Sequence, residues 1–336
     1  MTTRFLAIAL TIGSIAVAEN PYHIITKYPV AGEGGWDYVT LDAAARRIYL
    51  SHATQVDVID ADSGKAIGII ADTPGVHGIA LAPKSKHGFT SNGRENKVSV
   101  FNPSTLALIK KIDVGKGPDG IYFDAASNRV FTCNHGSDDI TAIDATKAEV
   151  VGTVKVEGAG EAMITGKDGL IYVNLEDKAE VAVFDPKTLE IKHRYPIGIA
   201  KTPTGLAYDP KTNHLFIGCR ETPTMVVMDA ATGKVIANFP IGAGVDWASW
   251  DSDAKNAFTS NGDGTLNVFH QKSATEYEDL GAVKTQQSAK TMAFDPKTKQ
   301  IFLPAAEFDV TPATDPSKRP TRKMKPGTFV VLVVGK

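Results

Sequence analysis

Short runs of alternating apolar and polar residues recur along the chain, and turn-forming residues separate them. Alternation with a period of two is typical of a half-buried β-strand, and clusters of Asp, Pro, Thr and Gly between such runs favour hairpin turns. One strand–turn–strand unit recurs as VDVIDADSGKAIGII (56–70), VSVFNPSTLALIKKI (98–112), ITAIDATKAEVVGTV (140–154), VAVFDPKTLEIKHRY (181–195) and MVVMDAATGKVIANF (225–239). Sustained helical periodicity is absent, so the pattern predicts an all-β chain.

Another pair of predicted strands precedes each of these units. Clear copies are IYFDAASNRVFTCN (121–134), LAYDPKTNHLFIGC (206–219), ASWDSDAKNAFTSN (248–261) and MAFDPKTKQIFLPA (292–305). Four short strands in a repeat of about 40 residues are typical of a β-propeller blade. The first strands of the repeats begin near Asp37, His77, Asp119, Glu161, Thr204, Asp246 and Lys290, at spacings of 40, 42, 42, 43, 42 and 44 residues. The spacing therefore predicts seven blades.

The last repeat has only three strands, MAFD, QIFLP and FVVLVVGK. The N-terminal segment YHIITKYPVAGEGG (22–35) resembles the outer-strand segments IKHRYPIGIA (191–200) and VIANFPIGAG (235–244). We therefore expect the N-terminal strand to complete the last blade, because pairing with the C-terminal strand removes an open sheet edge. The predicted fold is an all-β seven-bladed β-propeller with four antiparallel strands per blade.

The repeat resembles the YVTN-repeat β-propeller family, the YncE-like group of exported seven-bladed proteins. The resemblance is carried by Tyr172-Val173-Asn174, by FTSN at 89–92 and 258–261, by FTCN at 131–134, and by third strands such as VDVID (56–60). It covers essentially the whole mature chain and implies the fold, whereas function depends on the site that a fold carries. Blades four, five and seven depart from the motif with YVNL, FIGC and FLPA, so no site with an Asn in every blade is implied.

Residues 1–18 have the pattern of a secretory signal peptide. Arg4 precedes an apolar run that ends in Ala16-Val17-Ala18, an A-x-A pattern, so we expect cleavage after Ala18. The run is short for a membrane span, although an uncleaved anchor is the alternative. The prediction is a periplasmic or secreted protein in which residues 19–336 form one propeller domain without a membrane span.

Composition narrows the classes of partner and cofactor. The formal net charge is −2, which gives no basis for steering nucleic acid, and we expect a monomer. No C-x-x-C-H motif occurs, which excludes a covalent c-type haem. Cys133 and Cys219 belong to blades three and five, too far apart for a disulfide, so two free thiols are expected.

The aligned repeats place polar residues at two positions that we expect at the funnel mouth, where a small molecule, a peptide or a protein would bind. The first position begins the inner strand, and the second ends the next strand. His77 is the only imidazole of the first position. The alternative is that such residues satisfy backbone groups of loops. The candidate ligand-binding residues are Asp37, His77, Asp119, Glu161, Asp246, Lys290, His52, Asn92, Asn134, Arg220 and Asn261.

The same residues raise the question of a metal. Asp37, Asp119, Glu161 and Asp246 are candidate ligands for a divalent cation, although no local metal-binding motif is present. We expect an exported binding or interaction module. The alternative is a lactonase-like, metal-dependent hydrolase that uses His77 or His52 as acid and base.

One segment, AEFDVTPATDPSKRPTRKMKPG (306–327), interrupts the last blade and is basic and proline-rich. Loops of this length are usually functional or disordered. We expect it to emerge at the mouth, where it would cover the funnel and supply cations. The alternative is a solvated loop.

Overall fold

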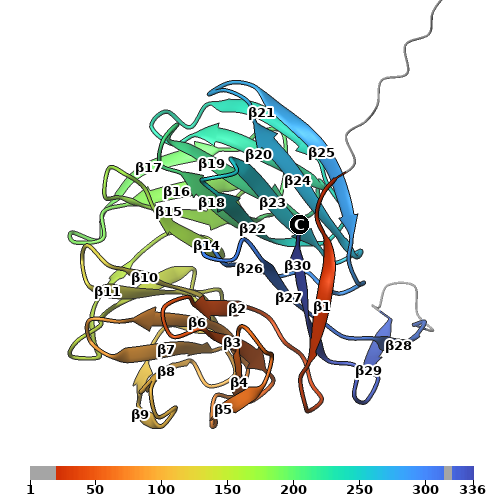
Figure 1. Ribbon diagram of the computed structural model, residues 1–336. Helices are drawn as coiled ribbons and strands as arrows, with labels where there is room; N and C mark the ends of the chain where they lie inside the picture. The colour runs from red at the N-terminus through yellow and green to blue at the C-terminus, as the bar shows by residue number, and fades with distance from the viewer. Residues whose placement is uncertain (1–19, 314–319) are drawn as a thin grey trace, which may run out of the picture.

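Strands arranged in seven four-stranded antiparallel blades make up a β-propeller, as the sequence predicts (Figure 1). The computed structural model describes residues 20–313 and 320–336, so the predicted signal peptide lies outside the described residues. Within those two ranges, no helix has the length and apolar character needed to cross a membrane.

Blades one to six each use four consecutive strands, and the inner strand comes first. Blades one to three contain β2 (Val39–Asp42), β3 (Arg47–His52), β4 (Gln55–Asp60), β5 (Ala66–Ile70), β6 (Val76–Ala82), β7 (His87–Asn92), β8 (Lys97–Phe101), β9 (Leu108–Asp113), β10 (Pro118–Asp124), β11 (Arg129–Asn134), β12 (Asp139–Asp144) and β13 (Glu149–Val154). Blades four to six contain β14 (Gly160–Thr165), β15 (Ile171–Leu175), β16 (Glu180–Phe184), β17 (Ile191–Pro196), β18 (Pro203–Asp209), β19 (His214–Cys219), β20 (Thr224–Asp229), β21 (Val235–Pro240), β22 (Val245–Asp251), β23 (Asn256–Asn261), β24 (Thr265–Gln271) and β25 (Tyr277–Lys284).

Blade seven joins the two ends of the chain. Its strand order is β26 (Ala293–Phe294), β27 (Ile301–Ala305), β30 (Val330–Gly335) and β1 (His23–Pro29). The N-terminal strand β1 pairs antiparallel with β30, from His23 opposite Gly335 to Pro29 opposite Val330. The predicted closure by the N-terminal strand is thus confirmed. A separate hairpin, β28 (Phe308–Thr311) and β29 (Thr321–Met324), interrupts this blade.

The Asp-based turns predicted between strands fold through their own side chains. In the outer hairpin of blade three, Asp144 Oδ1 accepts backbone N–H bonds from Thr146 at 2.9 Å and from Lys147 at 2.8 Å. The equivalent residues Asp60, Asn102 and Asp185 cap their turns in the same way. An Asx cap of this kind satisfies amides that the ladder leaves free, so each hairpin is specified locally.

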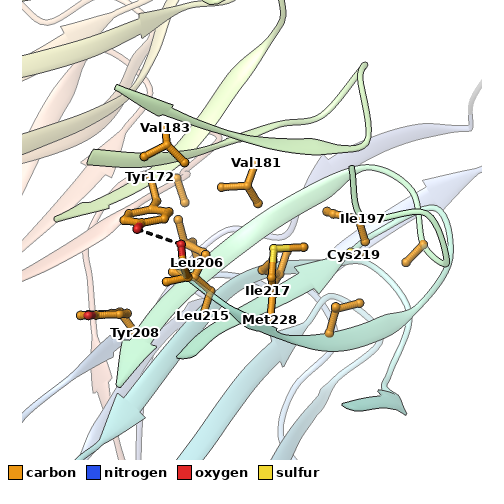
Figure 2. Packing of buried hydrophobic residues seen from close by; sticks show 14 residues of the cluster. Tyr172, Val181, Val183, Ile197, Leu206, Tyr208, Leu215, Ile217, Cys219 and Met228 are labelled. Carbon is orange, nitrogen blue, oxygen red and sulfur yellow. Dashed lines mark hydrogen bonds between the residues drawn. The ribbon is translucent and has the colours of Figure 1, made fainter. Parts of the chain in front are cut away.

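The core consists of apolar layers between neighbouring blades. Figure 2 shows the layer between blades four and five, where Val181 and Val183 face Leu206, Ile217 and Met228. Tyr172, buried in the same layer, donates its hydroxyl to the carbonyl of Ala230 at 3.0 Å. Because each blade packs both faces against its neighbours, strands such as β15 and β27 are buried at every position.

The two cysteines belong to this core. Cys219 lies in the layer of Figure 2, whereas Cys133 lies in the layer between blades three and four. Both are free and fully buried. The prediction of two free thiols is confirmed, and neither thiol is exposed at the mouth.

Ring closure gives a first prediction. A chain that begins at residue 31 lacks β1 and leaves the edge of β30 unpaired. We expect its thermal midpoint to fall by at least about 10 °C relative to a chain that begins at residue 20. A synthetic peptide of residues 20–30 should restore most of the loss by adding a strand to the open edge. Equal midpoints for the two chains, measured by differential scanning fluorimetry, would show that β1 does not close the ring.

Candidate ligand site at the funnel mouth

A β-bulge aims the first polar position of the inner strand into the mouth. In blade two the register of β6 with β7 shifts between Val76 and Ile79, and His77 lies in that interval. A bulged residue leaves the ladder and its side chain is re-aimed. The same irregularity encloses Asp119, Glu161, Thr204 and Asp246 in blades three to six.

A side chain from the preceding blade then fixes the backbone of several mouth residues. The donor is the third residue of the FTSN-like motif, which the sequence interpretation did not single out. The hydrogen-bonding residue at the third position of FTSN, FTCN and YVNL was the sequence feature that could have identified these donors. Four such bonds join neighbouring blades: Ser91 Oγ to the Asp119 carbonyl, Cys133 Sγ to Glu161 at 3.6 Å, Asn174 Nδ2 to Thr204 at 3.1 Å, and Ser260 Oγ to Lys290 at 2.6 Å.

The asparagines that end the motif lie inside the blades and not in the mouth. Asn92, Asn134 and Asn261 are fully buried. The amide of Asn134 donates to Asp139 Oδ1 at 2.7 Å and to Thr141 Oγ1 at 2.9 Å across the next hairpin. Their amide groups donate to residues of the next hairpin. These three residues are therefore not part of the candidate ligand site.

His52 has the same structural position in blade one. Its ring is buried, and Nδ1 lies 2.6 Å from Asp57 Oδ2 on the adjacent strand β4. The sequence interpretation offered His52 as an acid and base at the mouth. The structure instead places it beneath Phe329, with ring centroids 4.8 Å apart, so it is not available there.

Five side chains from blades one to four form a chain of carboxylates and imidazoles, which we call the carboxylate–imidazole cluster. His77 Nδ1 lies 2.7 Å from Asp37 Oδ2 and 3.5 Å from Asp119 Oδ1. His135 lies between the next two acids, with Nδ1 3.8 Å from Asp119 Oδ2 and Nε2 3.2 Å from Glu161 Oε2. His77 is therefore not the sole imidazole at the mouth. His135 lies in the turn after β11, one residue beyond the second aligned position, and was not among the candidate ligand-binding residues.

The opposite side of the mouth holds two cations on one acid. Asp246 forms ion pairs with both Lys290 and Arg220. Lys290 also lies 3.1 Å from Asp37 Oδ1, and Arg220 lies 3.4 Å from Glu176 Oε1. Both cations are more than a third exposed, at 37% and 39% of their side chains. Asp246 is thus paired with both cations, and Lys290 links it to Asp37.

These contacts make a circuit of alternating charge around the mouth. Taken in order, its members are Asp37, His77, Asp119, His135, Glu161, Glu176, Arg220, Asp246 and Lys290, which returns to Asp37. The alternation of acid and cation fails once, between Glu161 and Glu176. Blade five contributes an uncharged residue at the first position, Thr204, which is buried and bonds to backbone carbonyls.

Burial and these neighbours set the protonation of the mouth. Burial together with the charge of Glu161 raises the pKa of Asp119 to about 7. Burial disfavours the charged form of His135, but its bond to Glu161 and the charge of Asp119 outweigh that effect and raise its pKa to about 9. Burial and the charge of Glu161 also raise the pKa of Glu176. For Asp37, the charge of Lys290 and the contact with His77 outweigh burial and lower the pKa.

A separate apolar cavity of about 340 Å³ runs along the inner strands and reaches the mouth at Tyr38, Glu161 and Trp247. Tyr38 donates its hydroxyl to Glu161 of blade four and packs edge-on against Trp247 of blade six, with ring centroids 5.3 Å apart. Side chains from blades one, four and six therefore meet here between the polar mouth and the apolar cavity.

The basic insertion does not cover the mouth in its described part. Phe308 of β28 stacks on Trp36 with centroids 5.8 Å apart, and Arg322 of β29 lies 4.4 Å above the Phe308 ring. Figure 1 shows this hairpin at the edge of the ring, away from the inner strands β2 and β26. Residues 314–319 lie outside the described residues. The expectation that the segment covers the funnel therefore finds no support in 308–313 and 320–324.

Sequence comparison identifies the family. The family model described as a domain of unknown function, DUF5074, matches residues 45–212, half of the chain. The chain belongs to this family. No curated protein matches it in sequence.

Solved structures with the same fold are distant in sequence. A chain of hydrazine synthase from Kuenenia stuttgartiensis superposes with a TM-score of 0.71 at 16% identity, covering 82% of this chain and 94% of that one. U3-55K gives 0.77 at 8% identity, covering 92% and 98%. A chain of a mitotic checkpoint complex gives 0.73 at 14% identity, covering 97% and 100%. These similarities establish the β-propeller fold.

The buried motif asparagines give a prediction about stability. Asn92→Ala removes donors to Glu95 and Ser99 and leaves buried polar atoms without partners. We expect a loss of about 1–3 kcal/mol in the free energy of unfolding, measured by urea titration. Asn238→Ala, on the exposed face of β21, is the matched control and should change it by less than about 0.5 kcal/mol. A cost for Asn92→Ala no larger than that of the control would contradict the hairpin role.

The raised pKa of Asp119 gives a prediction about pH. The ordinary pKa of an Asp carboxyl is 3.8 and the folded value is about 7, so between these values the folded state binds more protons than the unfolded state. Its contribution to stability is therefore lost as pH rises from about 4 to 7. In EDTA-treated protein, urea unfolding at pH 5 and pH 7.5 should show a smaller loss of stability for Asp119→Asn than for the unmodified chain. An equal or larger loss in the variant would contradict this assignment.

Proposed function

We propose that this protein is an exported binding module that takes a small, amine-bearing ligand at the funnel mouth. The observation that carries the proposal is the single break in the charge circuit, where Glu161 and Glu176 follow one another without a cation between them. A ligand ammonium group at this place would complete the alternation, because a charge-assisted hydrogen bond to carboxylate is among the stronger polar contacts.

The surroundings of Glu176 support a ligand ammonium group between Glu161 and Glu176. Its Oε1 atom is buried and accepts no hydrogen bond within the described part of the chain. Burial and the charge of Glu161 raise its pKa although Arg220 lies 3.4 Å from Oε1, so the cations already present do not outweigh burial and the neighbouring acid. The partly exposed cations Arg220 and Lys290 lie further along the circuit, so a carboxylate on the same ligand would find partners there.

Export, family resemblance and oligomeric state complete the proposal. The pattern of residues 1–18 supports secretion to the periplasm or beyond. The FTSN and FTCN repeats support membership of the YncE-like group within the propeller fold. We propose that the chain acts as a monomer and recruits its ligand through the mouth.

A thermal-shift and calorimetric comparison tests the proposal. The probes are lysine, putrescine, spermidine and glucosamine. Succinate and glucose, which contain no amine, are the comparison compounds. We expect at least one amine to raise the thermal midpoint and neither comparison compound to do so. Glu176→Gln should weaken that binding by about tenfold or more, equivalent to about 1.4 kcal/mol.

The matched control is Glu149→Gln, which removes an exposed carboxylate on the outer strand β13. It should leave amine binding unchanged. The absence of binding by all four amines, or an equal loss of binding in the two variants, would overturn the proposal.

A further inference from the structure

Two carboxylates at the mouth converge on a single imidazole nitrogen. His77 Nδ1 lies between Asp37 Oδ2, at 2.7 Å, and Asp119 Oδ1, at 3.5 Å. One ligand atom from each residue lies within 4.8 Å of the other two. Ligands about 2.0–2.2 Å from a shared metal ion are separated by about 3–4 Å, so small movements would bring these three atoms to coordination distance.

An unsatisfied oxygen points to a missing occupant at this place. Asp119 Oδ1 is buried and accepts no hydrogen bond in the described part of the chain. The Asp119 side chain is only 17% exposed, and a buried carboxylate oxygen without a partner is costly. The same atom faces His77, so the unsatisfied acceptor belongs to the group of three.

We propose that Asp37, His77 and Asp119 bind one divalent transition-metal ion. His77 supplies an imidazole nitrogen through Nδ1, and the two acids supply carboxylate oxygens. This inference does not depend on the amine site, which lies at the Glu161–Glu176 break.

The donor set determines the class of ion. One imidazole and two carboxylates suit Zn²⁺ or Mn²⁺, whereas Ca²⁺ and Mg²⁺ prefer oxygen ligands alone. Three protein ligands leave at least one coordination position open to water or a ligand. The His77 side chain is 35% exposed, so an ion has access from the mouth.

The surrounding groups are compatible with such an ion. Lys290 contacts Oδ1 of Asp37 at 3.1 Å and leaves Oδ2 to the site. His135 faces the other oxygen of Asp119. Its Nε2 lies 2.5 Å from the carbonyl of Gly160, a contact that holds the ring from outside, as groups around metal ligands commonly do.

The second possible group, Asp119, His135 and Glu161, is less suited to a metal. Its three ligand atoms also lie within 4.8 Å of one another. However, Glu161 already accepts a bond from Tyr38 and contacts His135, and the Gly160 carbonyl occupies His135 Nε2. The unsatisfied oxygen therefore favours the group that contains His77.

The test is isothermal titration of EDTA-treated, dialysed full-length mature protein with ZnCl₂ at fixed pH, without any amine present. We expect one Zn²⁺ per chain, and little heat from MgCl₂ or CaCl₂. His77→Gln and Asp37→Asn should each weaken Zn²⁺ binding by about 100-fold or more. Substitution with Co²⁺ should give a visible absorption spectrum typical of mixed nitrogen and oxygen ligands, and His77→Gln should abolish it.

Two control variants locate the site. Glu149→Gln should retain the affinity, because Glu149 is an exposed residue of the outer strand β13. His135→Gln should weaken binding less than His77→Gln does, because His135 contacts Asp119 from outside the group of three. No Zn²⁺ binding by the unmodified protein, unchanged binding in folded His77→Gln, or an equal loss in His135→Gln would each overturn the proposal. Amine binding by Glu176→Gln is measured separately, so failure of one proposal is distinguishable from failure of the other.

Discussion

Closure of the ring by the pairing of β1 with β30 is the constraint on which the other features depend. Each blade is too small to bury its own apolar faces and relies on a neighbour at both sides. A ring that failed to close would expose the faces of blades seven and one together with the edge of β30. Closure also fixes the circumference, and hence the distances across the mouth that bring Lys290 of blade seven against Asp37 of blade one.

The fold and the site differ in how far the sequence predicts them. Strand order, blade number and N-terminal closure follow from the repeat, because seven approximate copies reinforce one pattern. Some residues of the first polar position, such as Asp37, His77 and Asp119, contact one another in the structure. The sequence did not determine the role of the motif asparagines. An Asn at the end of a strand has the same place in the pattern whether it faces solvent or bonds to the next hairpin. Only the contacts of Asn134 with Asp139 and Thr141 decide between the two.

His135 is a second example of a site residue that the sequence alone does not identify. It stands in a turn, at a position where other repeats have residues as different as Gly93, Glu176 and Arg220, so the alignment alone does not single it out. Its position between Asp119 and Glu161 depends on how blade three packs against blade four. Charge pairing between blades is a property of the assembled ring. The sequence supplies the side chains, but the packing of separate repeats decides which acid meets which cation.

The bulges of the inner strands have a consequence for variation. His77, Asp119, Glu161 and Asp246 lie where the ladder is interrupted, whereas Thr204 at the equivalent place is buried and bonds to two backbone carbonyls. The backbone at several of these positions is fixed by a side chain of the preceding blade, such as Ser91 or Cys133. Where the mouth residue is partly exposed, as His77 is, we expect the charge to be exchangeable while the blade remains as it is. Selectivity and folding are thus separable properties of this molecule, carried by different residues of the same short repeat.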